Sequence, residues 1–442
     1  MSQLSSLRRI TKVRVYPSVV LSLVLGVLVL PLSFSGVGLA KTTITFWTDW
    51  GGDGLAALES IATNFNKSQS AIEVKITTTG DLNTKLLTAI AGNAAPDLVL
   101  LDRYRTGEMA ARKALTPLDS YLARKDTTIK PDDFFRAAWN ETIYEGTVYS
   151  VPFYVDNRVL FYNIPRFEEA GLNAERPPQD WDDLVEYSRK LTSRGPDGRL
   201  KTVGYVPIWH GVSLTHYMWQ NGTDVFNAEQ TRVIFDQQPS VEALDWVVRF
   251  LDMYGGVAAL NELSGQFGSG AKDPLVTGQE AMKSDGNWMY GDMKKAVPQF
   301  IEKDLGLAPL PKGSQYATIA GGFSLAIPVN AKQKDAAWKF LQFAVSKESQ
   351  LLFAQRAGSI PALLAAAKDP AIIGNRFWRP FILSMEFARY RPVHPAFPEI
   401  EGFIYQAVDE AVNHRLSPQA ALKQAVEKAQ PILDRYNKHF RR

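Results

Sequence analysis

The sequence predicts an α/β fold in which a parallel sheet is covered by helices. Residues 43–101 form three strand-like segments separated by two helical segments, in the order βαβαβ, and this alternation is typical of a parallel sheet. A further strand-to-helix unit occurs at residues 323–345. The apolar fraction of 45% is that of an ordinary globular protein, and the length of 442 residues suggests two or three domains.

The first five elements follow from their apolar patterns. Thr43 to Trp47 alternate between apolar and polar side chains, which predicts a strand. Residues 55–66 and 82–91 carry apolar side chains at helical spacing, with a second strand at residues 72–78 between them. Residues 98–101 are apolar throughout, as expected for a strand that is buried on both faces.

Polar residues follow two of these strands. Asp49 and Trp50 lie in a glycine-rich turn after the first strand, and Asp102 and Arg103 come directly after the third. Ligands bind beyond the carboxyl ends of the strands in sheets of this kind. These four residues are therefore candidates for ligand contacts, although Asp102 could instead pair with Arg103 or cap the following turn.

The later strand-to-helix unit is preceded by Gly321 and Gly322, which allow the backbone to approach another segment closely. An apolar strand is predicted from Phe323 to Val329. A buried helical stripe then runs through residues 337–345, and the segment ends in a turn at residues 358–361.

The first forty residues have the order of a secretory signal. Four basic residues come first, residues 19–30 are almost wholly apolar, and small residues lead to Ala40. We expect cleavage after Ala40, although an uncleaved anchor is the alternative, since residues 19–39 could just span a bilayer. The chain has no cysteine, so neither a lipoprotein anchor nor a disulfide is expected, and the mature protein should be periplasmic.

Cleavage would also change the charge balance. Residues 1–40 contain four basic and no acidic residues, which leaves 45 basic against 46 acidic residues and a formal charge of −1. No basic surface for nucleic acid is therefore predicted.

Several motifs, taken in order, resemble one family. They are FWTDWGG at residues 46–52, APDLVLLDRY at residues 95–104, the segment from Tyr149 to Leu172, Asp285 to Trp288, and the unit from Gly321 to Ala362. Together they are similar to family 1 extracellular solute-binding proteins of ABC importers, which include maltose-binding proteins. The resemblance implies a monomer that captures a sugar or oligosaccharide and delivers it to the permease subunits of an ABC transporter in the membrane. It implies neither a cofactor nor a metal, and a polyol or glycerol-phosphate-type solute is the alternative ligand.

The resemblance also implies a fold. Two discontinuous α/β lobes of the type II periplasmic-binding-protein kind are joined by a hinge, with a ligand cleft between them. The first lobe is expected to hold residues 41–153 and 280–325. The second is expected to hold residues 154–279 and 326–442.

Sugars pack their C–H faces on aromatic rings and bond their hydroxyls to planar polar groups. On this basis the predicted ligand-binding residues are Asp49, Trp50, Asp102, Arg103, Tyr154, Asp156, Trp209, Trp219, Asn221, Trp288, Gly321, Gly322, Phe323 and Trp378. Each tryptophan could instead fill a core. Arg389 and Arg391 are expected to be structural, unless the ligand carries a phosphate, which arginine binds in a bidentate way.

An exported glycoside hydrolase is the alternative function, because it too would combine aromatic residues with paired carboxylates. Thiol catalysis is excluded by the absence of cysteine. The five histidines show no metalloprotease spacing, and no nucleophile elbow or phosphate-binding loop is present. These absences do not exclude a glycoside hydrolase, and it is the family resemblance that favours a binding protein without enzyme activity.

Overall fold

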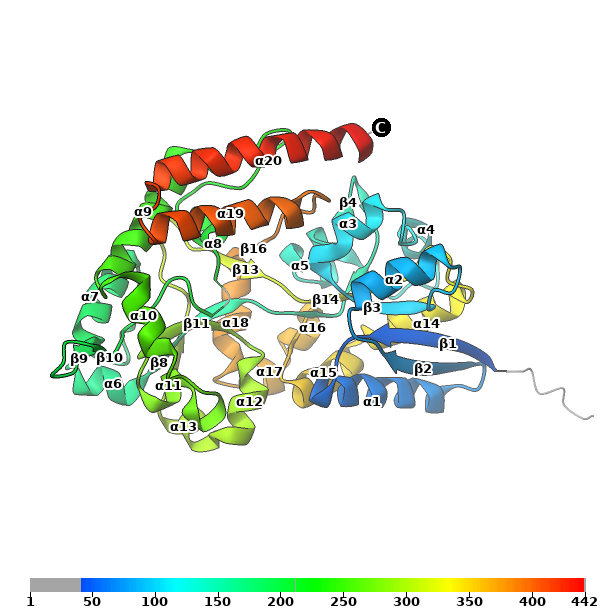
Figure 1. Cartoon of the computed structure of the whole chain (residues 1–442). Coiled ribbons are helices and arrows are strands. Elements are labelled where there is room, and N and C mark those ends of the chain that lie inside the picture. The colour runs from blue at the N-terminus through cyan, green and yellow to red at the C-terminus, as the bar shows by residue number, and fades with distance from the viewer. Residues whose placement is uncertain (1–40, 211, 441–442) are drawn as a thin grey trace, which may run out of the picture. The chain divides into compact units, whose positions relative to one another are not determined.

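The computed structural model describes residues 41–210 and 212–440, and it contains the predicted βαβαβ unit (Figure 1). The strands β1 (Thr42–Thr48), β2 (Ile72–Thr78) and β3 (Leu98–Asp102) alternate with the helices α1 (Gly52–Ser68) and α2 (Leu82–Ala91). Both β2 and β3 run parallel to β1. The side chains of residues 98–101 are fully buried, which confirms that this apolar run is a central strand.

Two further strands complete this sheet, and the first of them runs against the direction of β1, β2 and β3. β14 (Phe323–Ala326) pairs antiparallel with β3, and β6 (Val151–Pro152) pairs antiparallel with β14. The strand order is β2-β1-β3-β14-β6. The sheet is therefore mixed rather than purely parallel.

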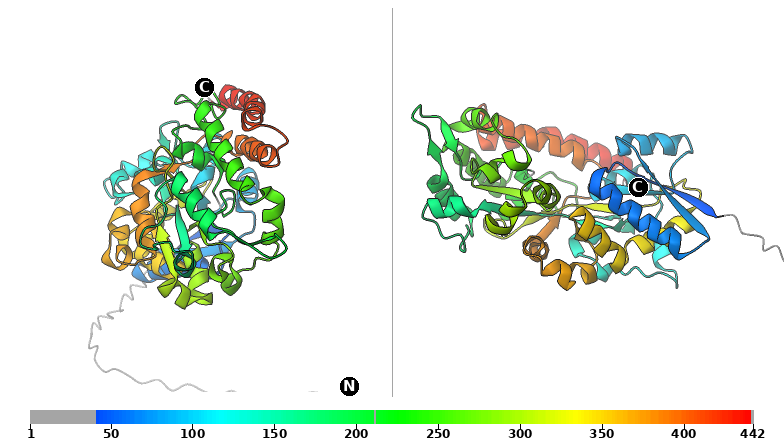
Figure 2. Two further views of the ribbon diagram at one scale, coloured as in Figure 1. Left: turned by 90° about the vertical axis from the view of Figure 1, so that its left-hand side faces the viewer. Right: turned by 90° about the horizontal axis from the view of Figure 1, so that it is seen from below.

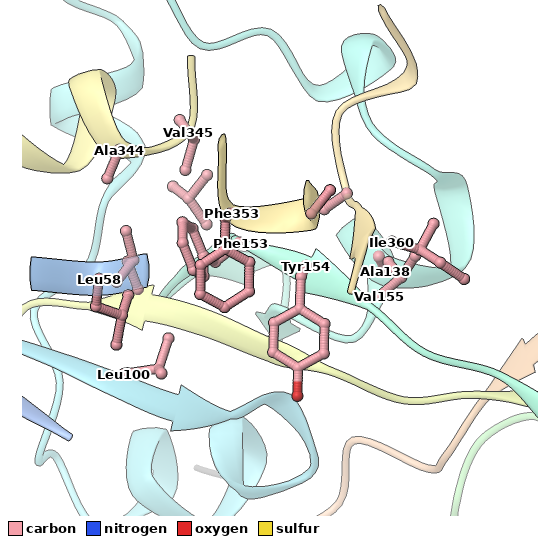
Figure 3. Packing of buried hydrophobic residues seen from close by; sticks show 14 of the residues in the cluster. Leu58, Leu100, Ala138, Phe153, Tyr154, Val155, Ala344, Val345, Phe353 and Ile360 are labelled. Atoms are coloured by element: carbon pink, nitrogen blue, oxygen red, sulfur yellow. The ribbon is translucent and has the colours of Figure 1, made fainter. Parts of the chain in front are cut away.

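The first hydrophobic core lies against this sheet. α14 (Lys334–Ala344) contacts α1 and β1, and α15 (Lys347–Ala357) contacts α1. Figure 3 shows part of the core, where the rings of Phe153, Tyr154 and Phe353 lie close together. The shorter elements assigned to this region are α3 (Thr106–Ala111), α4 (Asp119–Leu122), α5 (Arg136–Asn140), α16 (Leu364–Ala367), α17 (Pro370–Ile373), α18 (Trp378–Ser384), the hairpin β4 (Ile143–Tyr144) and β5 (Thr147–Val148), and the pair β7 (Tyr154–Val155) and β15 (Ile360–Pro361).

A second core lies against one face of a three-stranded antiparallel sheet, whose other face packs with the first core. Its strands are β11 (Met282–Gly286), β8 (Arg158–Asn163) and β12 (Leu305–Ala308), with β8 in the centre. The helices and small strands around it are α6 (Ile164–Glu169), α7 (Trp181–Leu191), α8 (Leu214–Gln220), α9 (Gln238–Asp252), α10 (Gly256–Ser264), α11 (Pro274–Thr277), α12 (Met289–Ala296), α13 (Pro298–Lys303), β9 (Ser193–Arg194) and β10 (Leu200–Thr202). The chain ends with α19 (Phe397–Val412) and α20 (Pro418–Phe440), which pack against each other, as Figure 2 shows.

The chain passes between the two cores along neighbouring segments. β7 leads into β8, and β13 (Thr318–Ala320) leads into β14. These two crossings touch at a bridge between Asp156 and Gly321. β16 (Ala388–Tyr390) pairs in parallel with β13 and forms the third crossing.

The predicted lobe boundaries stay a prediction, and the packing favours moving two segments. β11 and β12 were expected in the first lobe, yet both pair with β8 of the second sheet. α14 and α15 were expected in the second lobe, yet their apolar faces belong to the first core. The reason is that β11 and β12 pair with β8, which lies far from them in sequence, whereas α14 and α15 directly follow β14 and pack with its sheet.

The predicted signal segment, its cleavage after Ala40 and the alternative membrane anchor concern residues 1–40, which lie outside the described residues. Among residues 41–210 and 212–440, no helix is both long enough and apolar enough to cross a membrane.

Candidate ligand-binding site

A polar cavity of about 560 Å³ lies where the ends of β1 and β3 face residues of the second core. Six charged side chains line it: the carboxylates of Asp49, Asp102 and Glu401, and the guanidinium groups of Arg105, Arg158 and Arg391. Tyr104, Phe323 and Tyr405 add aromatic surface to the wall. The cavity therefore offers both charged hydrogen-bonding groups and ring faces.

The sheet explains why two predicted acids meet here. Asp49 follows β1 and Asp102 ends β3, so neighbouring parallel strands bring them to the same edge. Burial raises the pKa of the Asp49 carboxyl, a backbone hydrogen bond partly offsets this, and the negative charge of Asp102 raises it further. The pairing of β14 with β3 sets Phe323 opposite Asp102.

Arg391 follows β16 and joins two carboxylates. Its Nη2 lies 3.3 Å from Asp102 Oδ1 and its Nε lies 3.3 Å from Glu141 Oε1. Its guanidinium also lies 4.6 Å from the centre of the Tyr104 ring. Burial alone would lower the pKa of Arg391, but the charges of Glu141 and Asp102 outweigh burial and raise it. The guanidinium therefore stays charged within this network.

Tyr104 connects the end of β3 to α19. Its hydroxyl donates to Glu401 Oε2 at 3.1 Å, and its ring packs edge-on against Phe397. Burial raises the pKa of the Tyr104 hydroxyl, and the charge of Glu401 adds to this effect. The hydroxyl therefore stays protonated and remains a donor to Glu401.

Arg158 forms another part of the wall. Its Nη1 lies 2.6 Å from Asp156 Oδ1, and its guanidinium lies 4.8 Å from the centre of the Trp288 ring. The Trp288 side chain is 44% exposed, which is unusual for a tryptophan. Trp288 and Asp156 are thus placed next to the cavity through Arg158, and their predicted ligand contacts stay a prediction.

Some of the predicted site residues line the cavity, and others lie behind its wall. Asp49, Asp102 and Phe323 line the cavity itself. Trp50 and Tyr154 pack on Phe323 behind the wall, with ring centres 5.1 and 5.6 Å from it. These two rings could shape the cavity without touching a ligand.

Arg103 differs from the prediction that it donates to a ligand. It is fully buried, and its Nε lies 3.1 Å from Glu141 Oε2. Its two Nη atoms donate to the carbonyl oxygens of Tyr154, Gly321 and Phe323. Arg103 therefore holds two crossings together, and none of its nitrogens is left for a ligand in this structure.

Gly321 and Gly322 act in the same junction rather than on the cavity wall. A Cβ on Gly322 would lie 2.3 Å from the Tyr154 carbonyl oxygen, and its φ is +124°. A Cβ on Gly321 would lie 2.3 Å from Asp156 Oδ1. Both positions therefore require glycine for close approach of the crossings.

The remaining predicted residues are not brought to this cavity. Trp209 packs against Phe267, and Trp219 is buried beneath Arg389. The Asn221 side chain donates to a backbone carbonyl. Trp378 is buried beside Tyr290. For Trp219 and Trp378, burial in a core explains the residue without a ligand.

The sequence did not predict the cavity residues that come from α19 and the segment before it. Glu401 and Tyr405 lie four residues apart on α19 and so share one helix face. Arg391 was expected to be structural, and it is both a cavity residue and a structural one. Among the cavity residues that were not predicted, Tyr104 and Arg105 could have been identified from the sequence, because they closely follow Asp102 at the end of a buried strand.

Comparison with known proteins shows which family and fold the chain resembles. Residues 50–351 match the family model for bacterial extracellular solute-binding protein. The sn-glycerol-3-phosphate-binding periplasmic protein UgpB of Salmonella typhimurium is 26% identical over 453 aligned positions, which cover 93% of this chain and 97% of that protein.

Two solved structures are also similar. The sugar-binding protein MalE of Xanthomonas citri matches with a TM-score of 0.79 and 25% identity, covering 91% of this chain and 100% of that one. CpMnBP1 with mannotriose bound matches with a TM-score of 0.76 and 25% identity, covering 88% of this chain and 100% of that one. These likenesses confirm the predicted α/β fold of the two-lobe periplasmic-binding-protein kind.

Proposed function

This chain belongs to the family of bacterial extracellular solute-binding proteins, and we propose that it captures a neutral sugar or short oligosaccharide in the cavity that Asp49, Asp102 and Glu401 line. In this proposal the protein is a monomeric component of an ABC importer. It is exported, cleaved after Ala40, and delivers its ligand to the permease subunits in the membrane.

The choice of a neutral ligand over a phosphate rests on how the arginines of the cavity are paired. Arg105 lies 2.7 Å from Glu108, and Arg158 lies 2.6 Å from Asp156. Arg391 is shared between Asp102 and a second carboxylate. Every arginine that lines the cavity is thus already paired. A phosphate would have to share these guanidinium groups with their carboxylate partners and would meet the negative charges of Asp49, Asp102 and Glu401. A hydroxyl can donate to a carboxylate and accept from a neighbouring guanidinium at once.

The aromatic surface supports the same choice. Phe323 and Tyr104 lie on one side of the cavity lining, and Tyr405, whose side chain is 53% exposed, lies on α19. Ring faces of this kind pack on the C–H faces of sugars. A small phosphorylated polyol has little surface of that type to offer.

A glycerol-phosphate-type solute is the second candidate, and one observation favours it. UgpB, which is named for binding sn-glycerol 3-phosphate, aligns over 93% of this chain. Such a ligand would need to bind an arginine that is already paired with a carboxylate. An exported glycoside hydrolase is less well supported, because the similar proteins are named as binding proteins.

A thermal-shift panel distinguishes these ligands. We expect mannotriose, maltose or another neutral sugar to raise the melting temperature, since a ligand at a hundredfold its dissociation constant adds about 2.7 kcal/mol. sn-Glycerol 3-phosphate at the same concentration should leave it unchanged. A shift with glycerol phosphate alone would establish the second candidate instead. Chromatography of the sugar after incubation should show no cleavage products, and their appearance would identify an enzyme.

A further inference from the structure

We propose that the ligand carries a short apolar substituent, which binds in an apolar groove that continues from the polar cavity. The captured solute would then be a glycoside with an apolar aglycone, of about the size of a phenyl ring. This inference rests on the proposed function, because the sugar part of the ligand is what would occupy the polar cavity.

The groove is continuous with the polar cavity. It has a volume of about 230 Å³. Ile208, Val212, Ser213 and Tyr405 line both spaces. A substituent attached to a sugar that binds beside Tyr405 would therefore extend directly into the groove, without crossing packed protein.

The walls of the groove are mostly apolar and come from separate elements. Pro207 precedes α8, Leu214 begins α8, and Val247 belongs to α9. Val257 on α10 and Val408 on α19 close it. Four packed elements thus form the surface, so the groove exists without a ligand and costs little to organise.

Two of the polar groups along the groove, Tyr217 and Asp409, already have partners. The Tyr217 hydroxyl lies 2.8 Å from the Pro207 carbonyl oxygen and 2.9 Å from the Tyr205 hydroxyl. Asp409 accepts from Asn413 at 2.9 Å and also pairs with Arg415. A polar substituent would lose its water here and gain few hydrogen bonds in return. An apolar substituent loses nothing and is removed from water.

The volume limits the size of the substituent. An apolar cavity of about 150 Å³ is known to hold benzene, so this groove can take a phenyl group or a short alkyl chain. Each buried methylene contributes about fourfold in affinity. A phenyl glycoside should therefore bind at least about tenfold more tightly than the methyl glycoside of the same sugar.

The test is calorimetric titration of the mature protein with methyl and phenyl glycosides of D-glucose and D-mannose. The readout is the ratio of the two dissociation constants for one sugar, which we expect to be about ten or more. Val408→Asn should bring this ratio towards one, because it places an amide in the groove. Val257→Asn provides a second variant from the opposite wall. Val329→Asn is the matched control, because Val329 is exposed and does not line the groove. Its ratio of dissociation constants should equal that of the unmodified protein.

Other results would overturn the inference in distinguishable ways. A ratio near one in the unmodified protein, or weaker binding of the phenyl glycoside, would show that the groove takes no substituent while the proposed function stands. The same conclusion follows if free sugars bind and neither glycoside does. A high ratio that both groove variants retain would place the phenyl group elsewhere. Failure of every sugar and glycoside to bind would overturn the proposed function and this inference with it.

Discussion

Replacing Arg103 with methionine is expected to lower the free energy of unfolding by about 3–5 kcal/mol, the usual cost of removing one partner of a buried ion pair. The Arg103 side chain is fully buried against Glu141. It also donates to carbonyl groups at two of the crossings between the cores. Methionine would fill much of the volume but leave the Glu141 carboxylate with fewer donors and these carbonyls unpaired.

Denaturant unfolding of the ligand-free protein measures this loss. Lys190→Met, which removes an exposed ion pair with Glu186, is the control and should produce no measurable change. The double variant Arg103→Met/Glu141→Gln should recover part of the stability, because it removes a buried charge that has lost one of its two arginine partners. If Arg103→Met unfolds like the unmodified protein but binds ligand poorly, Arg103 contacts the ligand, as the sequence first suggested.

Acid should destabilise the protein through His216, which lies on α8 and is almost fully buried. Burial, together with the charge of Arg158, lowers the pKa of His216 to about 3. The unfolded chain takes up this proton near the ordinary value of 6.5. Between these values the unfolded state binds more protons, so stability falls as the pH falls. At pH 5 this one residue should cost about 2 kcal/mol relative to neutral pH.

The measurement is the free energy of unfolding at pH 7 and pH 5 for the unmodified protein and for His216→Gln, which cannot take up a proton. The loss between the two pH values should be about 2 kcal/mol smaller in the variant. Thr215→Val, a buried change on the same helix, should keep the full loss. An equal pH dependence in the protein with and without His216 would show that the histidine is protonated in the folded state or does not titrate as described.

The first sheet was predictable because its signals are local. Each strand and helix from Thr42 to Asp102 shows its period within its own residues, and the observed bounds differ from the predicted ones by three residues or fewer. The assignment of whole segments to lobes was not predictable in the same way. β11 is mostly polar and α14 has an ordinary apolar stripe, and nothing within either element indicates which sheet it packs with.

The residues of the candidate site also differ in whether a local sequence pattern predicts them. Asp49 and Asp102 could be predicted because ligands bind beyond the carboxyl ends of the parallel strands in this class of fold. Glu401 could not, because it lies on the face of a late helix that meets β3 only in three dimensions. Arg103 is the opposite case, because the sequence pattern selects it as a ligand contact and the packing explains it without a ligand. Its position after the strand suggested a ligand contact, but burial among backbone carbonyls gives it a structural role.

The most direct test of the account is the affinity of Asp102→Ala for a neutral sugar that shifts the melting temperature. Calorimetric titration should show binding weakened by about 1–3 kcal/mol, because a carboxylate that accepts ligand hydroxyls is lost. The melting temperature without ligand should change little, since Asp102 is partly exposed and Arg391 keeps Glu141 as a partner. Asp126→Ala, an exposed acid outside the cavity, should bind like the unmodified protein. Unchanged affinity in Asp102→Ala would contradict the account and place the ligand in another part of the chain.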